Sequence, residues 1–443
     1  CVTRRQRQMC IRDRNNTAYN MKFDLCPIFD SFEHFSKLPI GLTMLNEYPD
    51  TKLFIENLKP ELPSIIDDII QSQSFLRSYG RKSEATYRSY RNEIERFLLW
   101  SWTIAKKTIN SLSRQDLERY FDFLNKPPKS WVSSSVHSRF VRISGELRKN
   151  EKWRPFALKI SKSDRKQQLQ TSITPDPSKI AHQLSGEAMK ICFSAISSFY
   201  DYLTYEGYTF GNPIPAIRKQ SPYLLKGATQ TAIKRLSKLQ WDYVLHCCEI
   251  AADKDVKYER MLFLVALLKT LYLRVSELSV RKNWNPIWEH FWIDNDGNQW
   301  LKVLGKGNKI RDISVPNALL HYIKRYQNYR ISISPRFTSK DPIVSKNRGV
   351  GGMSSRQLRN IVQEAFDIAY EKMLSEGHRE ESKALQSATT HWLRHTGASE
   401  DISSRPLKHM ADDLGHSSMG TTDQVYIKSD MKERAATGKS RKV

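Results

Sequence analysis

The residue types best suited to chemistry lie in four short motifs and one tyrosine, all in the C-terminal half of the chain. In chain order these are LRVSEL (273–278), GKGNK (305–309), HWLRHT (391–396), LGHSS (414–418) and Tyr426. Each is a weak signal alone, because an HxxR spacing is common on surface helices and a GKG turn is common in hairpins. Their order makes the combination stronger, since together they supply a nucleophile, proton-transfer groups and fixed positive charge.

These groups suit the breaking of a DNA strand without a metal ion. A tyrosine hydroxyl has an ordinary pKa of about 10, so Tyr426 needs a base and an electrophilic phosphate before it can attack. Arg274 and Arg394 carry planar, permanently charged groups that match the non-bridging oxygens of a phosphate. Lys306 can also give up a proton, which an arginine cannot readily do. The set would therefore suit a reaction at a phosphate group.

The order of the motifs resembles the tyrosine recombinase, or phage integrase, family, whose catalytic pattern is Arg, Lys, His-x-x-Arg, His or Trp, and Tyr. The resemblance covers residues 235–430 and extends more loosely to the helical segment before them. It implies a site-specific DNA recombinase that needs no cofactor, metal or ATP. The residues that it marks as catalytic are Arg274, Lys306, His391, Arg394, His416 and Tyr426.

The resemblance also implies a role for each group. Tyr426 attacks the phosphorus and leaves a 3′-phosphotyrosine and a free 5′-hydroxyl, so a strand can be resealed without ATP. His391 acts on the tyrosine proton, and Lys306 protonates the leaving 5′-oxygen. His416 hydrogen-bonds the phosphate. Glu277 supports the site by orienting the arginines or His391.

Two positions depart from the family pattern. Tyr426 follows His416 by ten residues, where the family usually has nine. Tyr272 stands just before Leu-Arg, where the family commonly has a glycine. We expect this tyrosine to crowd the start of the arginine motif without removing activity.

Hydrophobic patterns predict the elements that position these residues. The segment 261–273 reads as a buried helix that leads directly to Arg274. Three short apolar runs separated by turn residues predict an antiparallel meander with Lys306 on its second turn. These runs are WEHFWID (288–294), QWLKVLG (299–305) and IRDISV (310–315). Helices return at 358–373, before the histidine motifs.

An earlier block reads as a small helical domain. Ser83 is placed to cap one helix, and Ser113 with Asp116 has capping-box spacing for a second helix. A third helix carries an apolar stripe from Met189 to Leu203. The fold class that we expect is mainly α with a small antiparallel β-sheet, as a helical DNA-binding domain and a mixed catalytic domain that form a C-shaped clamp.

The predicted domain organisation follows from these patterns. Residues 1–20 read as a non-native leader, with a native basic arm as the alternative, and residues 21–74 have no assignable role. The remaining parts are a helical core DNA-binding domain (75–212, with an insertion at about 126–184), a basic linker (213–234), a catalytic domain (235–430) and a C-terminal tail (431–443).

The charge of the chain points to a polyanion. Its 71 Lys and Arg against 47 Asp and Glu give a net charge of +24, which favours binding to nucleic acid through phosphate contacts. The longest apolar run is too short to span a bilayer, and the six irregularly spaced cysteines contain no CxxC pair. The candidate DNA contacts outside the catalytic set are Arg81, Lys82, Arg88, Arg91, Lys219, Lys309 and Arg311.

The expected partners are double-stranded DNA and three further copies of the chain, because the family recombines two duplexes in a tetramer. A directionality or DNA-bending protein would be an additional partner, and a prokaryotic, nucleoid-associated cytoplasmic location follows. We expect no metal, since Trp392 follows His391 where a zinc protease needs glutamate. A type IB topoisomerase and a catalytically silent DNA-binding protein on the same scaffold stay open as alternatives.

Overall fold

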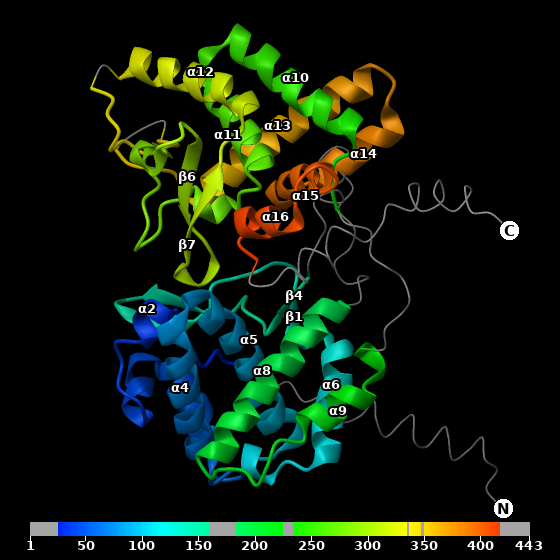
Figure 1. Ribbon diagram of the computed structural model, residues 1–443. Helices are drawn as coiled ribbons and strands as arrows, with labels where there is room; N and C mark the ends of the chain where they lie inside the picture. The colour runs from blue at the N-terminus through cyan, green and yellow to red at the C-terminus, as the bar shows by residue number, and fades with distance from the viewer. Residues whose placement is uncertain (1–24, 159–181, 225–233, 335, 347–349, 417–443) are drawn as a thin grey trace, which may run out of the picture. The chain divides into compact units, whose positions relative to one another are not determined.

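The computed structural model describes residues 25–158, 182–224, 234–334, 336–346 and 350–416. They form two compact units, drawn blue to green and green to red-orange in Figure 1. We call the described residues up to 224 the N-terminal unit and those from 234 the C-terminal unit. Each unit has its own main hydrophobic core.

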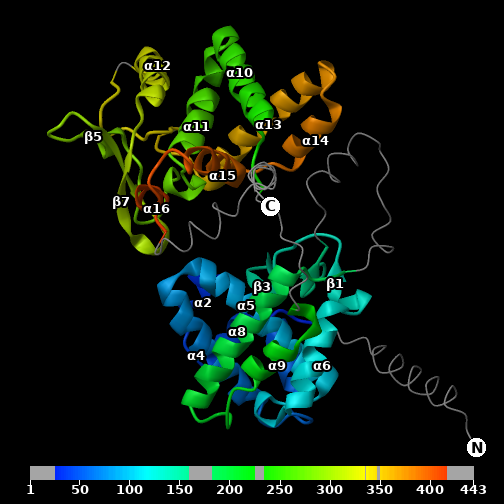
Figure 2. The ribbon, with the colours of Figure 1, turned by 45° about the vertical axis from the view of Figure 1, so that its right-hand side comes forward.

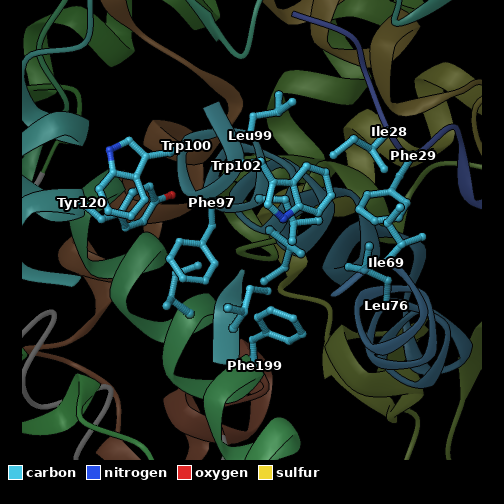
Figure 3. Close-up of a cluster of buried hydrophobic side chains, with 14 of the residues drawn as sticks. Ile28, Phe29, Ile69, Leu76, Phe97, Leu99, Trp100, Trp102, Tyr120 and Phe199 are labelled. Atoms are coloured by element: carbon cyan, nitrogen blue, oxygen red, sulfur yellow. The ribbon is translucent and has the colours of Figure 1, made fainter. Parts of the chain in front are cut away.

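The N-terminal unit is a bundle of helices around an aromatic core. Its α-helices are α2 (Phe32–Phe35), α3 (Pro49–Leu58), α4 (Ile65–Lys82), α5 (Glu84–Trp100), α6 (Arg114–Asn125), α8 (Gly186–Tyr205) and α9 (Ile214–Gln220). Figure 3 shows how α4, α5, α6 and α8 contribute to the core, with the indole of Trp102 and the ring of Phe199 among the buried groups.

The helix starts predicted from capping residues are confirmed. The Ser83 side chain accepts a hydrogen bond from the backbone of Thr86 at the start of α5. Ser113 and Asp116 form a reciprocal capping box at the start of α6. Both caps satisfy backbone donors that the first helical turn leaves unpaired.

Residues 132–157 add two small strand pairs to the N-terminal unit. Strand β1 (Val132–Ser133) pairs in parallel with β4 (Phe156–Ala157), and β2 (Phe140–Ile143) pairs antiparallel with β3 (Glu146–Lys149). The segment expected as an insertion therefore has ordered structure where it is described, and Trp131 and Trp153 are buried there.

Two segments differ from the sequence expectations. Residues 25–74, part of the segment 21–74 to which we could assign no role, contribute buried side chains to the same core as α5 and α8. The expected linker begins with helix α9, which buries Ile214 and Ile217 against the bundle. The reason is that Pro215 lies in the first turn of this helix, where a missing N–H costs nothing.

The C-terminal unit is built around a central buried helix. Its α-helices are α10 (Lys238–Lys254), α11 (Glu259–Thr270), α12 (Asn317–Ile333), α13 (Ser355–Ser375), α14 (Arg379–Ser387), α15 (Thr390–Asp401) and α16 (Leu407–Leu414). Helix α11 is buried along its apolar run and packs against α10, α12, α13 and α15 (Figure 1, Figure 2). This confirms the predicted buried helix.

The predicted meander is also present. Strands β5 (Phe291–Ile293), β6 (Gln299–Leu304) and β7 (Ile310–Ser314) form an antiparallel sheet in that order, with Trp300 opposite Ser314. The fold class expected from the sequence is therefore confirmed as mainly helical with a small antiparallel sheet. Within the described ranges, no helix has the length and apolar character needed to cross a bilayer.

Candidate active site

Arg274 lies at a sharp turn after α11. Tyr272, two residues earlier, has a left-handed backbone conformation with a φ of 50°, which allows the chain to reverse away from the helix. The turn of 3₁₀ helix at Val275–Glu277 follows directly. A glycine would adopt this conformation more readily, because non-glycine residues adopt it rarely.

Glu277 is the buried anchor of the site, since its side chain is only 1% exposed. One carboxylate oxygen accepts the backbone N–H of Arg274 at 2.8 Å, and the other accepts Nη1 of the same residue at 3.2 Å. Arg311 of β7 donates to both oxygens, at 2.9 and 3.1 Å. Burial raises the pKa of Glu277, but these guanidinium contacts outweigh it, so the pKa lies below its ordinary value.

Arg394 comes from α15 and is almost fully buried beside the same turn. Its Nη1 donates to the backbone carbonyl of Tyr272, and its Nη2 donates to the carbonyl of Leu414 at 2.8 Å. The same Nη2 lies 3.3 Å from Nε2 of His416. The structure therefore brings Arg394 and His416 into direct contact.

The end of α16 holds the two expected arginines together. Arg274 donates to the Leu414 carbonyl at 3.4 Å, so this oxygen accepts from Arg274 and Arg394. Gly415 ends the helix with a φ of 63°, a conformation suited to glycine, and its Cα faces the Arg311 side chain. This turn directs His416 to the arginines.

Burial and the neighbouring arginines together lower the pKa values of the nearby histidines. Burial, followed by the charges of Arg394 and Arg274, lowers the pKa of His391. Burial and the same two arginines, with Arg311, lower the pKa of His416 to about 4. Both imidazoles are therefore neutral at pH 7, which leaves each able to accept a proton or a hydrogen bond.

Lys306 lies exposed on the hairpin between β6 and β7, as predicted. Gly305, immediately before it, lies against Arg311 and Glu277, because a Cβ there would be 2.8 Å from Arg311 Nη1 and 3.7 Å from Glu277 Oε1. The base of the hairpin is thus part of the site.

A pocket of about 490 Å³ lies beside Arg274 and His391. Helix α13 contributes Arg359 and Gln363 to its lining, and neither was predicted as a site residue. In the sequence, only their i, i+4 spacing on the polar face of a predicted helix pointed to a shared site. Most polar helix faces simply contact solvent, so this spacing did not single them out. Among the described residues, no cluster of His, Cys, Asp or Glu is arranged to hold a metal ion.

The candidate DNA contacts divide into exposed residues and residues with partners inside the fold. Arg81, Arg88, Lys219 and Lys309 are exposed, although Arg88 forms an ion pair with Glu84 at 3.0 Å. The backbone of Lys82 ends α4, so the basic run 81–91 belongs to two helices and not to one.

Two of the candidate contacts, Arg91 and Arg311, donate to internal acceptors, and their expected contact with DNA stays a prediction. Arg91 is buried, and its Nη1 donates to the backbone carbonyl of Asp30 at 2.6 Å. Arg311 is committed to Glu277 and to the carbonyl of Asp413, which its Nε reaches at 2.9 Å. Both guanidinium groups hold the fold together, because a buried arginine needs internal acceptors.

Tyr426, the expected nucleophile, lies outside the described residues. The consequence of the ten-residue spacing from His416 therefore stays a prediction.

Residues 234–433 match the phage integrase family. The tyrosine recombinase XerC of Pseudomonas aeruginosa (strain LESB58) is 26% identical over 254 residues, which cover 57% of this chain and 72% of the relative. XerC of Alcanivorax borkumensis is also 26% identical, over 256 residues covering 57% of this chain and 72% of the relative.

Among solved structures, the chain is similar to the Tn1549 transposon integrase in complex with a circular intermediate DNA. The identity is 12% and the TM-score 0.49, covering 83% of this chain and 97% of that one. Residues 234–433 therefore form a phage integrase family domain, the family of the tyrosine recombinases, and the chain is similar to the XerC relatives.

Proposed function

We propose that this chain is a site-specific DNA recombinase that breaks and rejoins strands through a 3′-phosphotyrosine. One observation carries the proposal: Arg274 and Arg394 donate to a single oxygen, the carbonyl of Leu414. Two permanent positive charges are thus held around one point, and Glu277 offsets only part of the charge of the three neighbouring guanidinium groups. The scissile phosphate is the anion that would complete this arrangement.

In the proposed cleavage step, the phenolic oxygen of Tyr426 attacks the phosphorus. A bond forms from the tyrosine oxygen to phosphorus, and the bond from phosphorus to the 5′-oxygen breaks. The tyrosine proton passes to His391, and Lys306 supplies a proton to the leaving 5′-oxygen. The lowered pKa of His391 supports its role as the acceptor, since burial and the arginine charges keep the ring neutral.

The arginines would act most strongly in the transition state. Charge accumulates there on the non-bridging oxygens, and the paired guanidinium groups are already oriented by backbone carbonyls and Glu277. His416 would add a hydrogen bond to the same phosphate. Rejoining reverses the steps, with the 5′-hydroxyl of a second strand displacing the tyrosine.

The proposed reaction also implies partners, an assembly and a location for the protein. Exchange between two duplexes requires double-stranded DNA and four protomers in synapsis, with a directionality or DNA-bending protein as an additional partner. We also propose a prokaryotic cytoplasmic location near the nucleoid. The bacterial XerC relatives support this placement.

The test is capture of covalent protein–DNA adducts from cells that express the chain with its native flanking DNA. The reaction is stopped with detergent, the protein is purified, and any attached DNA is sequenced. We expect adducts from the wild type and none from Tyr426→Phe. Tyr370→Phe is the matched control, because Tyr370 is the nearest tyrosine before Tyr426 in the chain.

Each result decides a different point. Adducts in Tyr426→Phe would move the nucleophile elsewhere. Adducts in neither protein, even on a nicked duplex that prevents resealing, would favour the silent DNA-binding alternative. Relaxation of plasmid DNA without joint molecules would favour the topoisomerase.

A further inference from the structure

We propose that Tyr272 is a positioning residue of this active site, which fixes Arg394 through its carbonyl and the α15–α16 turn through its hydroxyl. The inference rests on the proposed function for its meaning in catalysis. Its structural part concerns two contacts of one residue, one made by the backbone and one by the hydroxyl.

The first contact is made by the backbone. The φ of 50° at Tyr272 turns its carbonyl to accept a hydrogen bond from Nη1 of Arg394. Any L side chain is strained in this conformation, so the tyrosine must be held there by other contacts. Gly397 of α15 makes the necessary room, because a Cβ there would lie 3.1 Å from Cδ1 of the Tyr272 ring and 2.1 Å from the Lys269 carbonyl.

The second contact is made by the hydroxyl at the far end of the ring. It donates to Oδ2 of Asp401, at the end of α15, and accepts from Nη1 of Arg405 at 3.1 Å. The Arg405 guanidinium also lies over the ring, 5.9 Å from its centroid. The ring itself is buried, so the tyrosine joins the end of α15 to the turn before α16.

The hydroxyl contact continues to the residues that hold His416. Nη2 of Arg405 donates to Oδ2 of Asp413 at 2.7 Å and to Oγ of Ser314 on β7 at 3.2 Å. Asp413 is followed by Leu414, whose carbonyl accepts from both catalytic arginine candidates. Tyr272 therefore reaches Arg394 directly and reaches the end of α16 through Arg405 and Asp413.

A tyrosine that only filled space would need neither contact. Its removal would lower stability without altering the arginine cluster in the folded protein. A positioning role instead predicts a changed environment at His416, since the depressed pKa of that ring depends on burial and on Arg394, Arg274 and Arg311. This difference gives a readout that does not require catalysis.

The experiment compares the full-length wild type with Tyr272→Phe and Tyr272→Gly. Tyr272→Phe keeps the ring and removes the hydroxyl, whereas Tyr272→Gly removes the side chain and relieves the backbone strain. Tyr322→Phe is the matched control, because its hydroxyl donates to Glu249 at 2.7 Å, between α12 and α10 of the same unit. Histidine titration by NMR, with His416→Gln to assign the signal, is measured beside cleavage of a nicked duplex containing the captured site.

We expect Tyr272→Phe to raise the pKa of His416 from about 4 toward its ordinary 6.5, because Arg394 is held less firmly and water enters the turn. Cleavage should slow about tenfold with unchanged DNA affinity, as expected for loss of hydrogen bonds to charged groups. Tyr272→Gly should have the larger effect on both, and Tyr322→Phe should change neither.

An unchanged His416 titration in both Tyr272 variants would overturn the inference, whatever the cleavage result. If the wild type fails to cleave any DNA, the proposed function fails, and the titration still decides whether Tyr272 positions the cluster. Equal effects of Tyr272→Phe and Tyr322→Phe on the titration would mean that the change is general loosening, which also overturns it.

Discussion

Two buried carboxylates, one in each unit, have opposite surroundings. In the N-terminal unit, Asp68 is fully buried. Its carboxylate accepts hydrogen bonds from three neutral donors, which are the Trp102 indole, the Tyr208 hydroxyl and the Ile109 backbone N–H. In the C-terminal unit, Glu277 is equally buried but accepts from guanidinium groups. Burial raises the pKa of Asp68 to about 7, whereas the arginine contacts bring the pKa of Glu277 below its ordinary value.

The contrast separates folding from function. A carboxylate surrounded by neutral donors closes a core and gains little from staying ionised. A carboxylate that binds several guanidinium groups holds them close together and neutralises only part of their charge. The remaining positive charge can bind a phosphate. The neighbours of these two carboxylates therefore distinguish a site that closes a core from a site that can receive an anion.

The largest loss of stability should come from Glu277→Gln. Removal of the negative charge leaves Arg274 and Arg311 close together without their shared acceptor, and breaking such a buried pair costs about 3–5 kcal/mol. Hydrogen–deuterium exchange along α11 of the full-length protein measures this loss separately from the N-terminal unit. The expected result is faster exchange in the C-terminal unit alone.

Glu259→Gln is the matched control for that measurement. Glu259 also binds an arginine with both oxygens, but its partner Arg325 keeps a second carboxylate, Asp253, at 2.8 Å. Its loss should cost less, about 1 kcal/mol. Equal costs for the two variants would mean that Glu277 is an ordinary ion pair and would break the comparison.

Asp68→Asn should cause a smaller loss of stability, and the size of this loss should depend on pH. The folded unit holds the Asp68 proton up to a pKa of about 7, while the unfolded chain releases it near the ordinary value of 3.8. Protonation therefore stabilises the folded unit fully below pH 3.8, and this contribution is lost as the pH rises to 7. The amide replaces the protonated acid, so the substitution should cost about 1 kcal/mol at pH 5 and less at pH 8.

Exchange along α4 measures this cost at both pH values. Asp116→Asn is the control within the same unit, because contacts with Lys107 and Ser113 lower the pKa of Asp116. Its stabilising contribution is present above the ordinary pKa of 3.8, so the cost of its loss should be flat from pH 5 to 8. A flat cost for Asp68→Asn as well would contradict the raised pKa.

Local patterns in the sequence predicted most of what local physics controls. The caps at Ser83 and Ser113, the buried helix before Arg274 and the three-stranded meander all depend on residues close together in the chain. The motif order also identified Arg274, Arg394 and His416, which the structure brings together around the end of α16.

Contacts between distant segments could not be read in this way. Arg91 and Arg311 resemble exposed phosphate ligands in sequence, and only the fold reveals that the Asp30 carbonyl and Glu277 receive them. The link from Tyr272 to Arg405 likewise spans 133 residues. Burial of a charged group is decided by tertiary packing, which neither charge runs nor periodicity encode.

The smallest effect should be a loss of DNA affinity on replacement of exposed lysines. For these residues we expect the two units to behave alike. Lys219 of α9 and Lys309 of the β6–β7 hairpin are both exposed, in contrast to Arg91 and Arg311. If each neutralises a DNA phosphate, its replacement by alanine should weaken binding to a random-sequence duplex a few-fold and reduce the salt dependence by about one counterion.

The measurement is affinity for that duplex over a series of salt concentrations. Lys238→Ala is the control, because Lys238 is also exposed but pairs with Asp242 at 3.1 Å. Arg311→Ala should instead lower stability, since its guanidinium lies inside the Glu277 cluster. A changed slope for Lys309→Ala alone would restrict the phosphate contact to the C-terminal unit, whereas unchanged slopes for both lysines would leave neither as a DNA ligand. The DNA contact would then have to come from other exposed cations.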